Sequence, residues 1–350
     1  MTNENLFFAG FLLFIVIMLA LDLGIFNKKE KVVSLKEAGV MSLIWVSFAF
    51  GFYFLLTQRG EMIHGIDSFE SLREIIAAHK HNITLIPNDF DASLGIYRKN
   101  LGLEFLTGYV VEYALSVDNI FVIVLILSAF GVEQRYYHRV LFWGILGAII
   151  MRFLFIFIGA TLISQFNWIL YLFGGFLVYT GVMMFVNRNE DERIDTENHR
   201  VVKWASKIFA VWPNYEGKKF FVKKQGKNLI TPLFIVLLVI EFTDLIFAVD
   251  SIPAIFAVTK DPYIVFFSNI FAILGLRSMF FLLVNIIHKF HYLKVGLSVL
   301  LIFIGVKMLA HDFLANIGFT TSHSLIIIVS ILVISVTASL LFPKKEEHAS

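Results

Sequence analysis

Six acidic residues lie inside long apolar segments of this 350-residue sequence. They are Asp22, Glu112, Asp118, Glu241, Asp244 and Asp250. Placing one such acid at the centre of a membrane span costs roughly 2.5–3.5 kcal/mol of insertion free energy. The six together would cost on the order of 15 kcal/mol if nothing compensated their charges. Arg152 and Arg277, in similar segments, can neutralise only two acids. The other four require protons, cations or a water-filled cavity, so ion pairing alone is disfavoured as their explanation.

Helical spacing would place most of these acids on narrow faces. One face carries Glu104, Gly108, Glu112, Ser116 and Asn119, and a second carries Glu241, Asp244, Ala248 and Ser251. Asp118 and Asp250 lie about 100° round an ideal helix from Asn119 and Ser251. Because proline removes a backbone donor, Pro253 predicts a kink or unwound turn over residues 249–252 that would swing Asp250 toward the other acids.

The two acidic segments resemble each other. Residues 112–120 align on 244–252, matching acid with acid, Val117 with Val249 and Asp118 with Asp250. If the segments are three spans apart they run in opposite directions, which predicts an inverted repeat of spans 3–5 and 6–8. Many secondary transporters are built in this way around a polar site at mid-membrane depth.

The side chains on these faces offer only oxygen and amide donors. Cysteine is absent from the chain, and no histidine lies at this depth. Such a site suits Mg²⁺, Ca²⁺ or Mn²⁺ better than Zn²⁺ or Cu²⁺. A divalent cation is therefore favoured, while an organic cation or amino acid, or protons alone, remain alternatives.

Composition places the rest of the chain in a bilayer. It is 58% hydrophobic and only 16% charged, with a mean hydropathy of +0.79, which excludes a water-soluble domain. The near-neutral net charge of +2 leaves no basic surface for nucleic acid. The sequence predicts an all-α polytopic membrane helix bundle of about nine spans. They cover about 6–26, 39–57, 104–129, 139–161, 166–186, 230–258, 263–285, 292–310 and 323–342.

The distribution of Lys and Arg predicts the orientation. The short loops on one side of the predicted membrane contain ten Lys and Arg residues, and those on the other side contain one. Since the cation-rich side is cytoplasmic, the N-terminus is expected outside and the C-terminus inside an inner or plasma membrane. The predicted regions are spans 1–2 (1–57), an outer loop (58–103), spans 3–5 (104–186), a cytoplasmic loop (187–229), spans 6–8 (230–310) and the last span with its tail (311–350).

Two polar segments interrupt the spans. The outer loop contains His64, His79 and His81, for which a solvated position is preferred over metal collection, although a small folded insert is plausible. The 187–229 loop mixes charges with aromatic residues, which is typical of a segment lying on lipid headgroups. Lys307 is expected to be a snorkelling anchor in the inner half of its span.

Several motifs together resemble the TerC family of integral membrane proteins, especially its Alx-type members. They are Phe105–Tyr109, Glu112–Asn119, Arg139–Gly147, Trp168–Gly174, Glu241–Ala257 and Ser268–Arg277. The resemblance implies nine spans, kinship with LysE-like exporters, a link to tellurite resistance, and manganese export. Tyr113 departs from the pattern, because relatives commonly carry lysine there.

By position in these motifs, the resemblance assigns Asp118, Asn119, Glu241, Asp244, Asp250 and Ser251 to the metal path, with Asp22 and Glu112 beside it for ion passage or proton coupling. Arg152 and Arg277 are expected to be counter-ions, and Asn269 a supporting hydrogen-bonding group. The prediction is export of Mn²⁺, as transported ion and not as cofactor, in exchange for protons. The alternative is a membrane scaffold, assembly or tellurite-resistance factor without transport activity. Catalytic motifs are missing from the sequence, so an enzyme is not expected, and the oligomeric state stays open.

Overall fold

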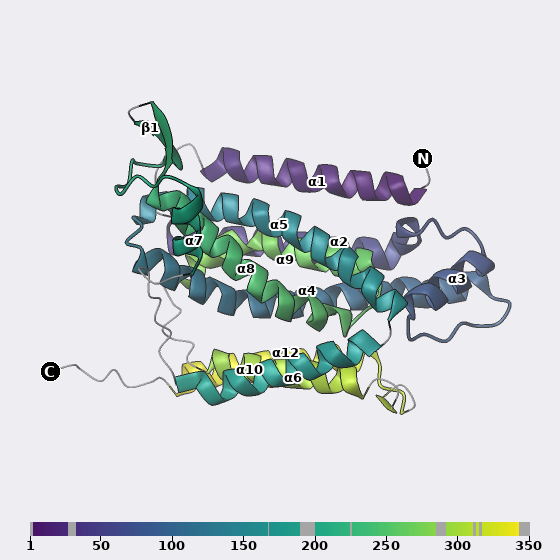
Figure 1. Cartoon of the computed structure of the whole chain (residues 1–350). Helices are drawn as coiled ribbons and strands as arrows, with labels where there is room; N and C mark the ends of the chain where they lie inside the picture. The colour runs from purple at the N-terminus through teal and green to yellow at the C-terminus, as the bar shows by residue number, and fades with distance from the viewer. Residues whose placement is uncertain are drawn as a thin grey trace.

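The computed structural model describes residues 3–26, 33–166, 168–189, 200–224, 226–284, 292–310, 313–314 and 317–342. These residues form a bundle of long helices with one small hairpin (Figure 1). The long helices are α1 (Asn3–Phe26), α2 (Leu35–Arg59), α4 (Phe90–Ala129), α5 (Gln134–Gln165), α6 (Trp168–Val186), α8 (Pro232–Phe256), α9 (Pro262–Leu283), α10 (Leu293–Leu309) and α12 (Thr321–Leu341). The predicted all-α membrane bundle is thus confirmed.

Each predicted span coincides with one of these helices. Seven described helices are long and apolar enough to cross a membrane, namely α2, α4, α5, α6, α8, α9 and α12. In α1 the side chains are described only for the shorter apolar stretch Leu6–Ala20, and α10 has 17 residues. The number nine and the inverted repeat therefore stay predictions. The cations at Lys28, Lys289 and Lys344, which contribute to the predicted orientation, lie outside the described residues.

Helix α9 occupies the centre of the bundle. Its apolar stretch is buried along the whole length, and the helix packs against α2, α4 and α5. Phenylalanine rings fill the space between these helices: Phe267 lies 4.3 Å from Phe11 of α1, and Phe52 of α2 lies 4.9 Å from Phe271 and 5.0 Å from Phe105, measured between ring centroids. Offset and edge-on ring contacts of this kind stabilise the packing of large apolar side chains.

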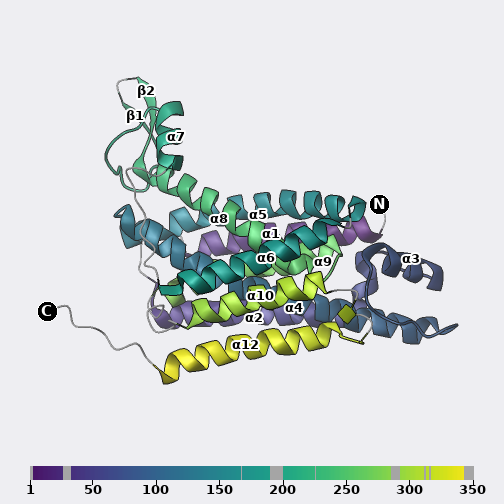
Figure 2. The same cartoon turned by 60° about the horizontal axis from the view of Figure 1, so that its bottom comes forward.

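Helices α6, α10 and α12 form a second group along one side of the bundle (Figures 1 and 2). Glycines bring α6 and α10 into backbone contact. A Cβ placed on Gly305 would lie 2.7 Å from the carbonyl oxygen of Gly174, and one on Gly181 would lie 2.8 Å from that of Ser298. Small residues are used in the same way where membrane helices approach closely.

The two ends of the bundle carry different structures, which we call the insert end and the hairpin end. The insert end holds η1 (Gly60–Ile63), α3 (Phe69–His79) and the first turns of α4. The hairpin end holds α7 (Arg200–Ile208) and the antiparallel pair β1 (Phe221–Lys224) and β2 (Lys227–Ile230). Figure 1 shows α3 and β1 at opposite ends of the molecule. Helix α1 begins at the insert end and α12 ends at the hairpin end.

Two local predictions differ from the structure. Helix α4 begins at Phe90, 14 residues before the predicted span at 104, because Asp89 accepts a hydrogen bond from the amide of Ala92 and caps a polar helical extension. Residues 249–252 are helical, so the unwound turn expected before Pro253 is wrong. Because Pro253 lies in the last turn of α8, only a few residues follow before the helix ends at Phe256.

The contact between α6 and α10 predicts a specific sensitivity to size. Gly305→Ala should destabilise the protein by about 1–3 kcal/mol, since the added methyl group must push two backbones apart. Gly175→Ala, next to Gly174 but with nothing within 4 Å of the added Cβ, should leave stability unchanged or slightly raised. Thermal unfolding of the detergent-purified variants measures the difference; equal melting temperatures for both would contradict the packing argument.

Candidate functional site

A buried polar network lies at mid-length of the bundle and centres on Arg152 of α5. Its guanidinium pairs closely with Glu112 of α4, donates to Asn269 Oδ1 of α9 at 2.8 Å, and lies 3.4 Å from Asp244 Oδ1 of α8. Ser251 Oγ lies 3.5 Å from Nη1, at the limit of a hydrogen bond. Asn269 Nδ2 also donates to Glu112 Oε2 at 3.2 Å. Four helices thus contribute to one group, which we call the central network.

Helix packing explains why these residues meet. A Cβ on Gly108 would lie 2.8 Å from Ser268 Oγ, so the glycine lets α9 approach α4 closely. One turn further along α4, Glu112 therefore faces Asn269. Asp244 is the central residue of α8, which packs against both α4 and α5. The sequence-predicted face of α4 is buried throughout, from Glu104 to Asn119.

The charges of the central network do not balance when both acids are ionised. Arginine remains protonated in proteins, so one guanidinium faces two carboxylates. Within the described residues, neither Glu112 nor Asp244 has a further cationic partner. Asp244 Oδ2 is buried and accepts no hydrogen bond from the described part of the chain. A buried carboxylate oxygen without a partner is costly, and it can be satisfied by a proton or by a cation.

Other predicted residues lie around the central network. Glu241, one turn before Asp244 on α8, places its carboxylate where a Cβ on Gly147 of α5 would be. Asp250 instead accepts a hydrogen bond from Thr180 Oγ1 of α6 at 3.3 Å. The structure therefore brings Glu112, Asp244, Ser251 and Asn269 together around Arg152, and directs Asp250 toward α6.

The remaining predicted residues are more distant or less defined. Asn119 is 3% exposed and its Nδ2 donates no hydrogen bond among the described residues, while the neighbouring Asp118 is half-buried. Arg277 is buried on α9, eight residues after Asn269, or about 12 Å along the helix axis. Asp22 belongs to α1, but its side chain lies outside the described residues.

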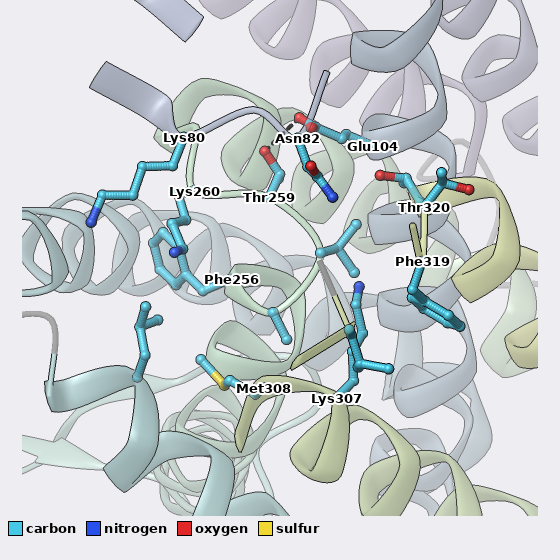
Figure 3. Close-up of a pocket in the computed structure, with 15 residues that line it drawn as sticks. Lys80, Asn82, Glu104, Phe256, Thr259, Lys260, Lys307, Met308, Phe319 and Thr320 are labelled. Atoms are coloured by element: carbon cyan, nitrogen blue, oxygen red, sulfur yellow. Dashed lines mark hydrogen bonds between the residues drawn. The ribbon is translucent and has the colours of Figure 1, made fainter. Parts of the chain in front are cut away.

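A second polar group lies at the insert end. Glu104 of α4 accepts hydrogen bonds from Thr259 Oγ1 at 2.6 Å and from Asn100 Nδ2 at 2.7 Å, and its Oε1 lies 3.0 Å from His81 Nδ1. Figure 3 shows Glu104 and Thr259 beside a pocket that Lys307 also lines. Because Lys307 lies at the insert end, an inner position for Lys307 and an outer position for the 58–103 loop exclude each other, and which side is cytoplasmic stays a prediction.

The histidines of the insert are also more enclosed than predicted. The side chains of His64 and His81 are 2% and 1% exposed, so the expectation of solvated histidines is wrong for these two. Both face Asp261, at the N-terminus of α9. Sequence reasoning did not select Asp261, although an aspartate directly before Pro262 is a recognised signal for a helix start.

Electrostatics at the insert end follows from this arrangement. Burial opposes ionisation of Asp261, but the surrounding His64, His79 and His81 hold its pKa well below the usual range. Burial likewise opposes protonation of His81, yet Glu104 and Asp261 raise its pKa to about 9. For His79 burial dominates, with help from the neighbouring imidazoles, and its pKa is lowered.

Comparison with known proteins identifies the family. Residues 97–347 match the family described as "Integral membrane protein TerC family". The chain belongs to the TerC family. The match begins after the insert, so η1 and α3 lie outside it.

Several similar proteins span nearly the whole of this TerC chain. An "Uncharacterized membrane protein STKORF319" of Myxococcus xanthus is 43% identical over 344 residues, covering 97% of this chain and 93% of that protein. Proteins named "Putative membrane-bound redox modulator Alx" are 43% identical over 312 residues in Photorhabdus laumondii (89% of this chain, 88% of that protein) and 40% identical over 314 residues in Escherichia coli K12 (88% and 87%). No solved structure gives a significant match.

The central network predicts how this TerC protein responds to loss of one charge. Arg152→Gln should destabilise it by about 3–5 kcal/mol, because Glu112 would be left buried without its cation. Adding Glu112→Gln should restore part of the loss, since a neutral amide is cheaper to bury. Thermal unfolding of the two single variants and the double variant measures the coupling. Purely additive effects would show that the pair does not act as a unit.

Proposed function

We propose that this TerC protein exports divalent cations, with Mn²⁺ as the favoured ion, in exchange for protons. The supporting observation is the charge imbalance of the central network, where Asp244 presents a buried carboxylate oxygen that no described residue hydrogen-bonds. Ser251 and Asn269 lie within reach of the same guanidinium and add neutral oxygen atoms. An all-oxygen donor set of this kind suits Mn²⁺, Mg²⁺ and Ca²⁺.

In this proposal a cation must compete with Arg152 for the acids of the central network. The guanidinium lies between Glu112 and Asp244, in the position where a cation would otherwise neutralise these two acids. The contact with Asp244 is the longer, at 3.4 Å. A metal ion would therefore take Asp244 from Arg152, while Glu112 stays paired. After the metal ion has been released, protonation would neutralise the Asp244 carboxylate. This lowers the free-energy cost of keeping the metal-free site buried while the protein reorients it.

The other acids form the rest of the proposed path. Glu241 lies one turn from Asp244 toward the hairpin end, and Asp250 lies closer to the insert end on the same helix. Asp118 and Asn119 line α4 on the hairpin side of Glu112. With the hairpin end in the cytoplasm, as the loop charges predict, Mn²⁺ would reach Asp244 past Glu241 and Asp118 and leave past Asp250. Asp22 on α1 would be a further residue of this path.

The names of the relatives suggest a different role, redox modulation. This chain has no cysteine, so a redox role through thiols is not available to it. A scaffold or assembly factor without transport activity is the competing hypothesis, and tellurite resistance would then be indirect. Ion flux separates these possibilities.

Asp244→Asn should abolish Mn²⁺ accumulation driven by a pH gradient in inside-out vesicles or proteoliposomes. The substitution keeps the shape of the side chain but removes the negative charge that the cation requires. Asp91→Asn, an exposed acid in the first turn of α4, is the matched control and should transport normally. Absence of flux of Mn²⁺, Mg²⁺, Ca²⁺ and protons by folded wild-type protein would overturn the proposal and favour the scaffold.

Gly147→Ala should reduce the same Mn²⁺ flux severalfold without preventing folding. Its methyl group would occupy the position of the Glu241 carboxylate, which must then turn away from α5. Gly144→Ala, one turn earlier on α5, meets only Ile240 Cγ2 at an ordinary 3.5 Å, and should retain the wild-type rate. Equal rates in the two variants would remove Glu241 from the path.

A further inference from the structure

We propose that His64, His79, His81 and Asp261 form a second metal site at the insert end, selective for a divalent transition metal of the Zn²⁺ class. One ligand atom each from His64, His79 and Asp261 lies within 4.8 Å of the others. The rings of His64 and His79 are 4.8 Å apart between centroids and inclined by 31°. Tetrahedral Zn²⁺ holds its ligand atoms about 3.3 Å apart, so side-chain shifts of about 1 Å would close the site.

The two carboxylate oxygens of Asp261 have separate roles. Oδ1 caps α9, accepting hydrogen bonds from the amides of Tyr263 at 2.9 Å and Ile264 at 3.5 Å. Oδ2 points the other way and lies 2.8 Å from His64 Nε2. Because the cap fixes the carboxylate through Oδ1, Oδ2 is held among the histidines and can bind a metal without loss of the helix cap.

His81 supplies the independent sign of a metal. The whole residue is 6% exposed and its side chain 1%, and its Nδ1 lies 3.0 Å from Glu104 Oε1. The opposite ring nitrogen, Nε2, is buried, has no hydrogen bond to any residue that the structure describes, and lies 4.0 Å from Asp261 Oδ2. Metal-binding histidines are typically held in this way, with the second nitrogen bonded to a carboxylate. His81 thus has the orientation of a fourth ligand, from which binding would release a proton.

Three imidazoles and one carboxylate indicate which metal would bind. Imidazole nitrogen suits Zn²⁺, Cu²⁺ and Ni²⁺, whereas Mn²⁺ and Mg²⁺ prefer oxygen. The donors of the insert end therefore differ from the all-oxygen donors of the central network, and the two sites should prefer different ions. The inference goes beyond the proposed transport, because zinc binding by these four residues does not require that the protein move Mn²⁺.

Such a site would join parts that are distant in the sequence. His64 follows η1, His79 ends α3, and Asp261 begins α9 after the loop from α8. A bound metal would link the insert to the loop between α8 and α9, next to Thr259 and Glu104. The immediate consequence is stabilisation by zinc, since a ligand that binds only the folded state raises its stability.

Zinc binding by the full-length protein, purified in detergent and stripped with EDTA, tests the inference by calorimetry. We expect one zinc ion whose affinity falls at least about 100-fold in His79→Gln, because loss of even an outer partner of a ligand costs about 10–100-fold. His323→Gln is the matched control, an exposed histidine at the start of α12 where glutamine preserves the capping box. It should bind zinc like the wild type, as should Asp244→Asn.

X-ray absorption of the zinc-loaded wild type provides a test that does not depend on the folding of any variant. At least two imidazole ligands are expected around the zinc. A zinc coordination shell made only of oxygen atoms, or an unchanged zinc affinity in His79→Gln, would overturn the proposed site. The insert end would then be a network of carboxylates and a protonated His81 without a metal. Because Asp244→Asn affects only the central network, failure of zinc binding and failure of Mn²⁺ transport remain distinguishable.

Discussion

Burial of the Arg152 guanidinium is the constraint on which the centre of the bundle depends. Its charge cannot be removed by deprotonation, and it has no contact with solvent. Carboxylates and amides from neighbouring helices must therefore surround it, and those from α4, α8 and α9 do. Removing one partner of such a group is expensive, because it leaves a buried charge uncompensated. A proton or metal ion that takes the place of Arg152 at Asp244, as proposed, would have to supply the compensation that the guanidinium gives up.

The helices that supply the partners are held by two kinds of contact. Phenylalanines fill the wide spaces around α9, while glycines allow close approach where polar groups must meet or backbones touch. Gly108 and Gly147 are next to Glu112 and Glu241, so the narrow contacts lie beside the acids. Gly174 and Gly305 play the same part between α6 and α10, away from the central network. Glycine thus determines where charges come together in a structure otherwise packed with large apolar side chains.

Helix α4 connects the two polar groups of the molecule. Glu104 and Glu112 lie on the same face, eight residues or about 12 Å apart along the axis. The first binds His81 of the insert and Thr259 after α8, and the second binds Arg152. Any shift of α4 against α8 and α9 would change both sets of contacts, because both acids move with one rigid helix. Helix α4 is therefore common to the insert end and the central network, whether or not a metal is bound at the insert end.

The sequence by itself determined the membrane class, the approximate position of each long helix apart from the first 14 residues of α4, and the polar face of α4. These follow from hydropathy and helical periodicity along one segment. Every residue of the central network is among the candidates that the sequence singles out, while the function of that network stays a proposal. Only the tertiary structure decided that Arg152 pairs with Glu112 and Asp244, that Asp250 turns toward Thr180, and that the insert histidines converge on Asp261. Those contacts join residues from different helices. Their geometry depends on how the helices rotate and approach, which periodicity within a single helix does not specify.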